Sequence, residues 1–116
     1  MDLENFLSRL TTHPDSIEFN ELMDIIEANY DFSPTSFKNG ELFNEQGQND
    51  GSCKVFSFAK IHKLTQAQTL ACFGAYYRDD VLKKPSEDNH QNIRNFMKTG
   101  WSEIKFEANA LSPKSA

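Results

Sequence analysis

Cys53 and His90 are the two residues of this sequence whose types could do chemistry together. Cys53 follows the polar stretch at residues 48–52 and opens an apolar segment, so it stands where a helix is expected to begin. A thiol in the first turn of a helix lies near the positive end of the helix dipole, which lowers its pKa toward the thiolate. His90 would then serve as the base, and Asn49 or Asp50 would orient it. One hypothesis is therefore a compact thiol-dependent enzyme.

The segment that follows Cys53 favours a different interpretation. Residues 53–61 are apolar on most sides of a helix, which is typical of a central buried helix. Burial in apolar surroundings raises the pKa of a thiol, and an unreactive buried cysteine behaves as a small hydrophobic residue. We therefore expect Cys53 to be mostly buried and not to be a nucleophile. Cys72 is expected at a similar level in the next helix, so a redox pair stays open, although two reduced core thiols are favoured.

Two polar stretches carry the candidate binding residues, which are Tyr76, Tyr77, Arg78, Asp79, Asn92 and Arg94. Tyr76 falls beside an apolar helical stripe and is expected to be a surface aromatic. The helix start near His90 could hold an anion on its free backbone N–H groups. The bland interpretation is stronger, because Asp79 with Lys83 and Asp80 with Lys84 have the i, i+4 spacing of solvated helix pairs.

Several classes of site and partner lack support in the sequence. The three histidines share no metal-ligand spacing, and no zinc, phosphate-loop or dinucleotide motif is present, so we expect neither metal nor cofactor. A net charge of −5 argues against general nucleic-acid binding. No apolar run of about 18 residues predicts a membrane span. Two cysteines are too few for a disulfide framework, which indicates synthesis in a reducing cytoplasm.

The hydrophobic pattern predicts an α+β domain that is mostly helical. Apolar stripes at helical spacing predict five helices, within residues 3–10, 15–30, 52–62, 65–81 and 88–100. Their expected N-terminal signals are Asp15 with Glu18, Asp50 or Ser52, Thr65 with Gln68, and Asp88 with Gln91. We expect one buried cluster that contains Phe56, Leu70, Phe73, Phe96 and Met97.

The remaining segments predict a small antiparallel sheet of about three strands. Residues 35–44 hold the Asn39-Gly40 pair that a type I′ hairpin turn needs, and this turn would place Phe37 opposite Leu42 and Lys38 opposite Glu41. Residues 103–107 alternate and are expected to join the same sheet. A chain of 116 residues suits one domain. We expect it to cover residues 1–110, with a frayed tail at 111–116.

Four blocks of the sequence resemble one known family. They are YDFSPTSFKNGE, GQNDGSCKVFSFAK, QAQTLACFGAYYRDDVL and HQNIRNFMKTGWSEIKFE, and together they cover about residues 3–113. They are similar to the HopJ family of type III effector proteins. The resemblance implies a small bacterial protein, made in the bacterial cytoplasm, of a family first described among effectors that plant pathogens deliver into host cells. It implies no established reaction, cofactor or catalytic residue.

Two functions therefore remain in competition. The first is an interaction module that docks an unidentified protein partner, through the surface around residues 76–80 and the loop at 44–51. The second is the thiol enzyme that uses Cys53 and His90. An enzyme requires Cys53 in a pocket with His90 within about 4 Å, whereas an interaction module is compatible with a buried thiol. The apolar content of residues 53–61 favours the interaction module, and no pattern indicates an oligomeric state.

Overall fold

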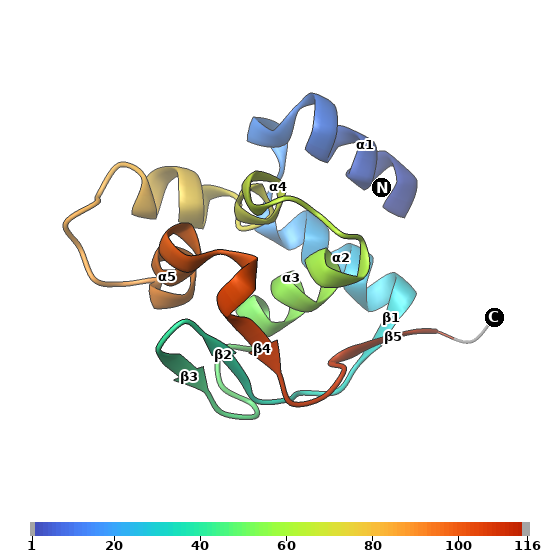
Figure 1. Cartoon of the computed structure of the whole chain (residues 1–116). Coiled ribbons are helices and arrows are strands. Elements are labelled where there is room, and N and C mark those ends of the chain that lie inside the picture. Colours follow the sequence, from blue (N-terminus) through green and yellow to red (C-terminus); the bar gives the residue numbers. More distant parts are fainter. Residues whose placement is uncertain (1, 115–116) are drawn as a thin grey trace.

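The apolar segment after Cys53 forms the central helix of the structure. The computed structural model describes residues 2–114, and in it helix α3 (Asp50–Ile61) lies behind the other elements and is surrounded by them (Figure 1). Its side chains at Val55, Phe56, Phe58 and Ala59 are fully buried. Residues that are apolar on most sides of a helix lower the free energy only when neighbours cover all those sides. The expectation of a central buried helix is confirmed.

The other helices pack around α3. They are α1 (Leu3–Thr12), α2 (Phe19–Asn29), α4 (Gln66–Ala71) and α5 (Gln91–Thr99), with the short 3-10 turns η1 (Pro14–Ser16) and η3 (Trp101–Glu103) and the π-helix η2 (Tyr76–Val81). Phe56, Leu70, Phe73 and Phe96 share one buried cluster, as expected. Met97 was expected in this cluster but is 37% exposed, because α5 buries the face that carries Asn92, Ile93 and Phe96.

Five short strands form two antiparallel sheets in the described residues. Strands β2 (Phe37–Asn39), β3 (Leu42–Asn44) and β4 (Ile104–Phe106) make a sheet in the order β3-β2-β4, which confirms the expected hairpin and its third strand. Strand β1 (Tyr30–Phe32) pairs with β5 (Leu111–Pro113) in a second sheet that was not expected. The α+β class is confirmed.

The expectation of a frayed tail from residue 111 is wrong for its described part. Leu111 is buried, and its strand pairs with β1 in register from Tyr30↔Pro113 to Phe32↔Leu111. Backbone pairing and burial of Ala110 and Leu111 hold this segment, which a short polar sequence did not indicate. Residues 115–116 of the predicted tail lie outside the described residues.

The hairpin turn is displaced from the predicted position. The observed register pairs Phe37 with Asn44 and Asn39 with Leu42, so Gly40 and Glu41 connect the strands. Of the predicted turn residues only Gly40 has a positive φ, at +63°. Asn39 stays in the strand because its side chain is fully buried and bonded to α5, a tertiary contact that outweighs its turn propensity.

Three helix starts also differ from the predicted ones. Helix α2 begins at Phe19 with a capping box of Glu18 and Glu21, because Pro14–Ser16 forms a separate turn. Helices α3 and α5 begin after Asn49 and His90, which replace the expected side-chain caps at Asp50 or Ser52 and at Asp88. The capping box of Thr65 with Gln68 is confirmed.

The single helix expected over residues 65–81 is interrupted at Gly74. Helix α4 ends at Ala71, Gly74 has a φ of +59°, and the π-helix η2 starts at Tyr76. A Cβ atom at position 74 would lie 2.8 Å from the backbone nitrogen of Phe19. Glycine therefore permits both the left-handed conformation and the close approach of α2 to this bend.

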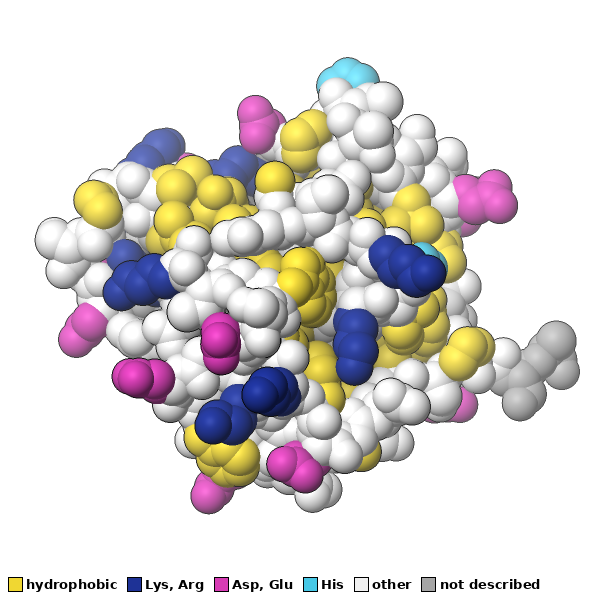
Figure 2. Space-filling model, in the orientation of Figure 1, with side chains coloured by type: hydrophobic (Ala, Val, Ile, Leu, Met, Phe, Trp, Pro, Cys, Tyr) yellow, Lys and Arg dark blue, Asp and Glu magenta, His cyan; other side chains and the backbone are white. Residues whose placement is uncertain are grey.

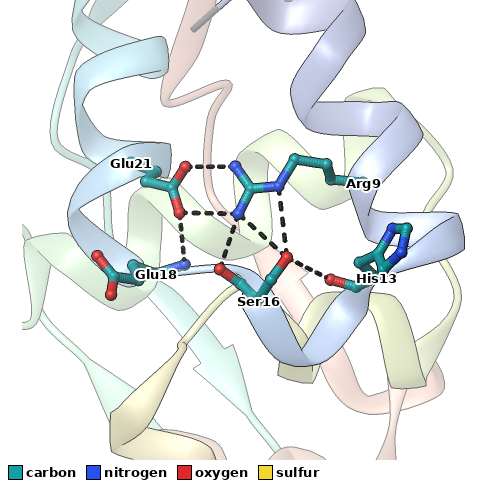
Figure 3. Close-up of polar contacts among 5 residues, drawn as sticks. All are labelled: Arg9, His13, Ser16, Glu18 and Glu21. Atoms are coloured by element: carbon teal, nitrogen blue, oxygen red, sulfur yellow. Dashed lines mark hydrogen bonds and ion pairs between the residues drawn. The ribbon is translucent and has the colours of Figure 1, made fainter.

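An arginine on α1 ties the first helix to the start of the second (Figure 3). The Nη1 of Arg9 lies 2.6 Å from a carboxylate oxygen of Glu21, and its Nη2 donates to the carbonyl oxygen of Ser16 at 2.8 Å. The Oγ of Ser16 in turn donates to the carbonyl oxygen of His13. The hydrogen bond from Arg9 lowers the pKa of Glu21, which also accepts from the backbone N–H of Glu18.

We predict that Gly74→Ala destabilises the protein by about 3 kcal/mol. The left-handed conformation costs an L-residue roughly 1–2 kcal/mol, and the collision with the backbone of Phe19 adds a similar amount. Gly47→Ala is the matched control, because Gly47 has a φ of +84° but no atom within 4 Å of the added Cβ. Urea unfolding of both variants measures the difference. Equal losses for the two variants would contradict the predicted collision.

We also predict a pH dependence from Glu21. A lowered pKa in the folded state stabilises the protein above the unfolded carboxyl pKa of about 4.3, and this stabilisation is lost as the pH falls through the folded value. Glu21→Gln should therefore be less stable than the parent near neutral pH, with a difference that shrinks as the pH drops below about 4. The exposed Glu27→Gln on the same helix is the control. A difference that stays constant with pH would refute the assignment.

Candidate functional site

A cleft of about 570 Å³ opens where the starts of α3 and α5 meet the π-helix η2. Its apolar lining comes from Phe19, Leu42, Phe73 and Ile93. Its polar lining comes from Asn49, Ser52, Tyr76, His90, Gln91 and Asn92, with Gly51 between them. We call it the Tyr76–His90 cleft. None of the described residues that line it is Asp, Glu, Lys or Arg.

Two helices begin at this cleft. Their N-caps, Asn49 and His90, both adopt the left-handed conformation, with φ of 55° and 51°. The first turn of a helix leaves backbone N–H groups without helical partners and carries the positive end of the dipole. Gly51 belongs to the first turn of α3 and allows close packing, since a Cβ there would lie 2.9 Å from the ring of Phe19.

The aromatic side of the cleft is built on Tyr76. The Tyr76 ring is 43% exposed, lies 5.2 Å from the Phe19 ring in an edge-on contact, and lies 5.3 Å from the His90 ring. The expectation that Tyr76 is a surface aromatic is confirmed. Tyr76 opens a π-helix, a rare conformation that often occurs at functional sites.

Asp80 orients His90 from the same π-helix. The Nε2 of His90 lies 3.1 Å from a carboxylate oxygen of Asp80, which joins η2 to the N-cap of α5. The sequence pattern paired Asp80 with Lys84 instead, and this prediction is wrong because the loop after η2 returns His90 to Asp80. The pair of Asp79 with Lys83 is confirmed at 2.9 Å on the exposed surface.

Four buried or half-buried asparagines lie beneath the polar side of the cleft. Asn92 and Asn44 exchange amide hydrogen bonds of 2.9 and 3.1 Å. The Nδ2 of Asn39 donates to the backbone oxygen of Asn92 at 2.7 Å and to its Oδ1 at 3.1 Å. The Nδ2 of Asn49 donates to the Oδ1 of Asn44 at 2.7 Å. This asparagine network links the hairpin to the starts of both helices.

Cys53 lies in the core and does not line the cleft. Its side chain is 1% exposed, and its Sγ lies 3.9 Å from the backbone oxygen of Thr35. Burial raises the pKa of the Cys53 thiol and raises that of Cys72 to about 12. The expected burial of Cys53 is confirmed, and both cysteines are free thiols. The structure thus places His90 in the cleft and Cys53 in the core; Asp50 does not line the cleft.

The candidate binding residues do not form one surface. Tyr76 and Asn92 line the cleft, whereas Tyr77 and Arg78 line a smaller hollow on the side of α1 and α4. Arg94 is not free to hold an anion in the way the sequence suggested, because its guanidinium donates to the backbone and side-chain oxygens of Asn89. That interaction instead fixes the loop before α5.

Sequence reasoning missed the apolar half of the cleft. Phe19 and Leu42 come from distant elements and carry no local signal of a site. Ser52 was expected only as a helix cap. Within residues 2–114, no three His, Cys, Asp or Glu side chains gather closely enough to hold a metal ion. No helix of that part of the chain has the length and apolar character needed to cross a membrane.

The comparisons agree with the resemblance seen in the sequence. The model of the HopJ type III effector protein family matches residues 3–111, and the chain belongs to this family. A solved structure titled "Crystal structure of unknown function protein VPA0580" is 51% identical, covers 98% of this chain and 95% of its own, and superposes with a TM-score of 0.96. No protein with a curated description matches. Neither relative brings a biochemical activity.

We predict that native Cys53 reacts with iodoacetamide more slowly than a free cysteine near neutral pH, because its thiol is buried and its pKa is raised. Cys72→Ser isolates the signal of Cys53, and the urea-unfolded protein supplies the rate of the accessible thiol. Rapid native labelling that titrates with a pKa well below about 8.5 would show a reactive thiolate.

Proposed function

We propose that this HopJ-family protein is an interaction module and that an extended segment of a partner protein binds in the Tyr76–His90 cleft. The carrying observation is that one open cleft combines an apolar lining, a half-exposed tyrosine and the starts of two helices. Binding sites for peptide segments commonly unite an apolar pocket with a few oriented polar groups.

The chemistry of the cleft specifies the partner segment. Helix starts attract negative charge, and no carboxylate lines the cleft to oppose it. A segment that places a bulky apolar side chain against Phe19 and Phe73 and a neighbouring carboxylate at the helix starts is complementary to both features. The protein as a whole carries a charge of −5, so this attraction is local to the cleft.

The rest of the visible surface offers no stronger alternative. Lys and Arg side chains are interspersed with Asp and Glu on the face drawn in Figure 2, where neither sign of charge forms a continuous field. Binding of nucleic acid relies on such a basic field. The thiol-enzyme hypothesis loses its main support because Cys53 is buried away from His90. A protein partner is the class that the cleft supports best.

Family membership supports a second part of the proposal. A HopJ type III effector protein is made in a bacterial cytoplasm and leaves it through a type III secretion system. The cleft would then meet its partner in the cell that receives the protein. A translocation reporter fused to the C-terminus of the chain tests this part, and a signal equal in strains with and without a type III system would contradict it.

A displayed library of random peptides tests the cleft directly. We expect selection on the native protein to enrich peptides with a carboxylate beside a bulky apolar residue. Ser52→Glu should weaken the selected peptides about tenfold or more, because it puts a carboxylate into the cleft. A negative residue in the first turn suits helix α3, so the fold is retained.

Ala67→Glu is the matched control for this experiment. It places the same charge in the first turn of α4, on an exposed residue outside the cleft, and should change affinity less than about twofold. Weakening by added salt would agree with charge complementarity. Failure to enrich any acidic-apolar peptide, or equal binding by the Ser52→Glu and Ala67→Glu variants, would overturn the proposal.

A further inference from the structure

Asn39 is the only asparagine of the chain that is followed by glycine. In a flexible chain, the backbone nitrogen after an asparagine can attack the side-chain amide carbon, and a following glycine hinders this attack least because it has no side chain. The folded structure holds the Asn39-Gly40 pair in a different state. Gly40 N–H donates to the backbone oxygen of Glu103 at 3.0 Å, so its nitrogen is engaged with strand β4.

The side-chain amide of Asn39 is held just as firmly. Asn39 is fully buried, and its Nδ2 donates to two oxygens of Asn92, at 2.7 and 3.1 Å. The residue also lies in the middle strand of its sheet, opposite Leu42 on β3 and Ile104 on β4. Ring closure requires the Gly40 nitrogen and the Asn39 amide carbon to leave these contacts and meet. Reaction therefore requires the hairpin to open.

We propose that Asn39 is a deamidation site that the fold protects and that unfolding exposes. In the open chain, the Gly40 nitrogen loses its proton and bonds to the Asn39 amide carbon, and ammonia leaves. Water then opens the resulting five-membered imide at either carbonyl, which yields aspartate or isoaspartate. The net reaction consumes one water and releases one ammonia, and it requires no other reactant. This inference does not depend on the proposed function.

The modified residue no longer fits the folded structure. Aspartate at position 39 would direct a carboxylate oxygen at the two oxygens of Asn92 that now accept hydrogen bonds, in a fully buried place. A buried charge without a partner is strongly destabilising. Isoaspartate would also add a backbone atom at the end of β2 and break its register with β3 and β4. Unfolding that lasts long enough for the reaction thus becomes irreversible.

Peptide mapping by mass spectrometry tests the proposal. Native and urea-unfolded samples of the full chain are incubated at mildly alkaline pH, and the exchange of NH₂ for OH at Asn39 is followed over time. We expect the unfolded rate to exceed the native rate more than about a hundredfold, because only the open fraction reacts. The other asparagines serve as internal controls. Similar rates in the two states would overturn the proposal.

Refolding tests the second half of the inference. After removal of urea, the fraction that fails to regain the native circular dichroism signal should equal the fraction converted at Asn39. The purified variant Asn39→Asp should refold poorly, whereas Asn109→Asp, at an exposed position, should refold like the parent. Full refolding of converted chains, or equal behaviour of the two variants, would refute irreversibility.

Discussion

The amide pair between Asn44 and Asn92 is the contact on which the cleft depends. Asn44 ends a strand of the hairpin, Asn92 lies in the first turn of α5, and each donates to the other in a buried setting. Asn39 and Asn49 attach to the same pair and bring in the middle strand and the start of α3. Because buried amides cost free energy unless they are satisfied, the two helix starts are held in one arrangement.

The apolar side of the cleft depends on two close approaches of Phe19. Its ring reaches the start of α3 because residue 51 is glycine, and its backbone reaches the bend before η2 because residue 74 is glycine. The bend ends α4 and lets the chain continue as a π-helix. That change of helix type places Tyr76 at the mouth of the cleft and Asp80 beside His90. Packing and polar contacts therefore converge on one surface.

Local signals predicted the parts of this architecture that local energetics govern. The Thr65 capping box, the apolar faces around Phe56 and Phe96, and the hairpin with its third strand all agree with the structure. These features follow from periodicity and from hydrogen bonds between residues near in sequence. The turn at Asn39 and the tail at residue 111 were misplaced, because distant partners in α5 and β1 decided their conformations.

The site could be predicted only in part, and the division has a physical cause. His90, Asn49, Tyr76 and Asn92 were recognised as candidates because their residue types and positions near helix ends are visible in the sequence. Their assembly with Phe19 was not visible, since it depends on packing between elements far apart in the chain.

The sequence by itself determined the family, the α+β class, the central buried helix and the burial of Cys53. Composition and hydrophobic period carry that information, because apolar area removed from water dominates the folding free energy. Only the tertiary structure decided that His90 pairs with Asp80, that Arg94 holds its own loop, and that two helices start at one cleft. Those outcomes depend on directional contacts between distant residues, which no local pattern encodes.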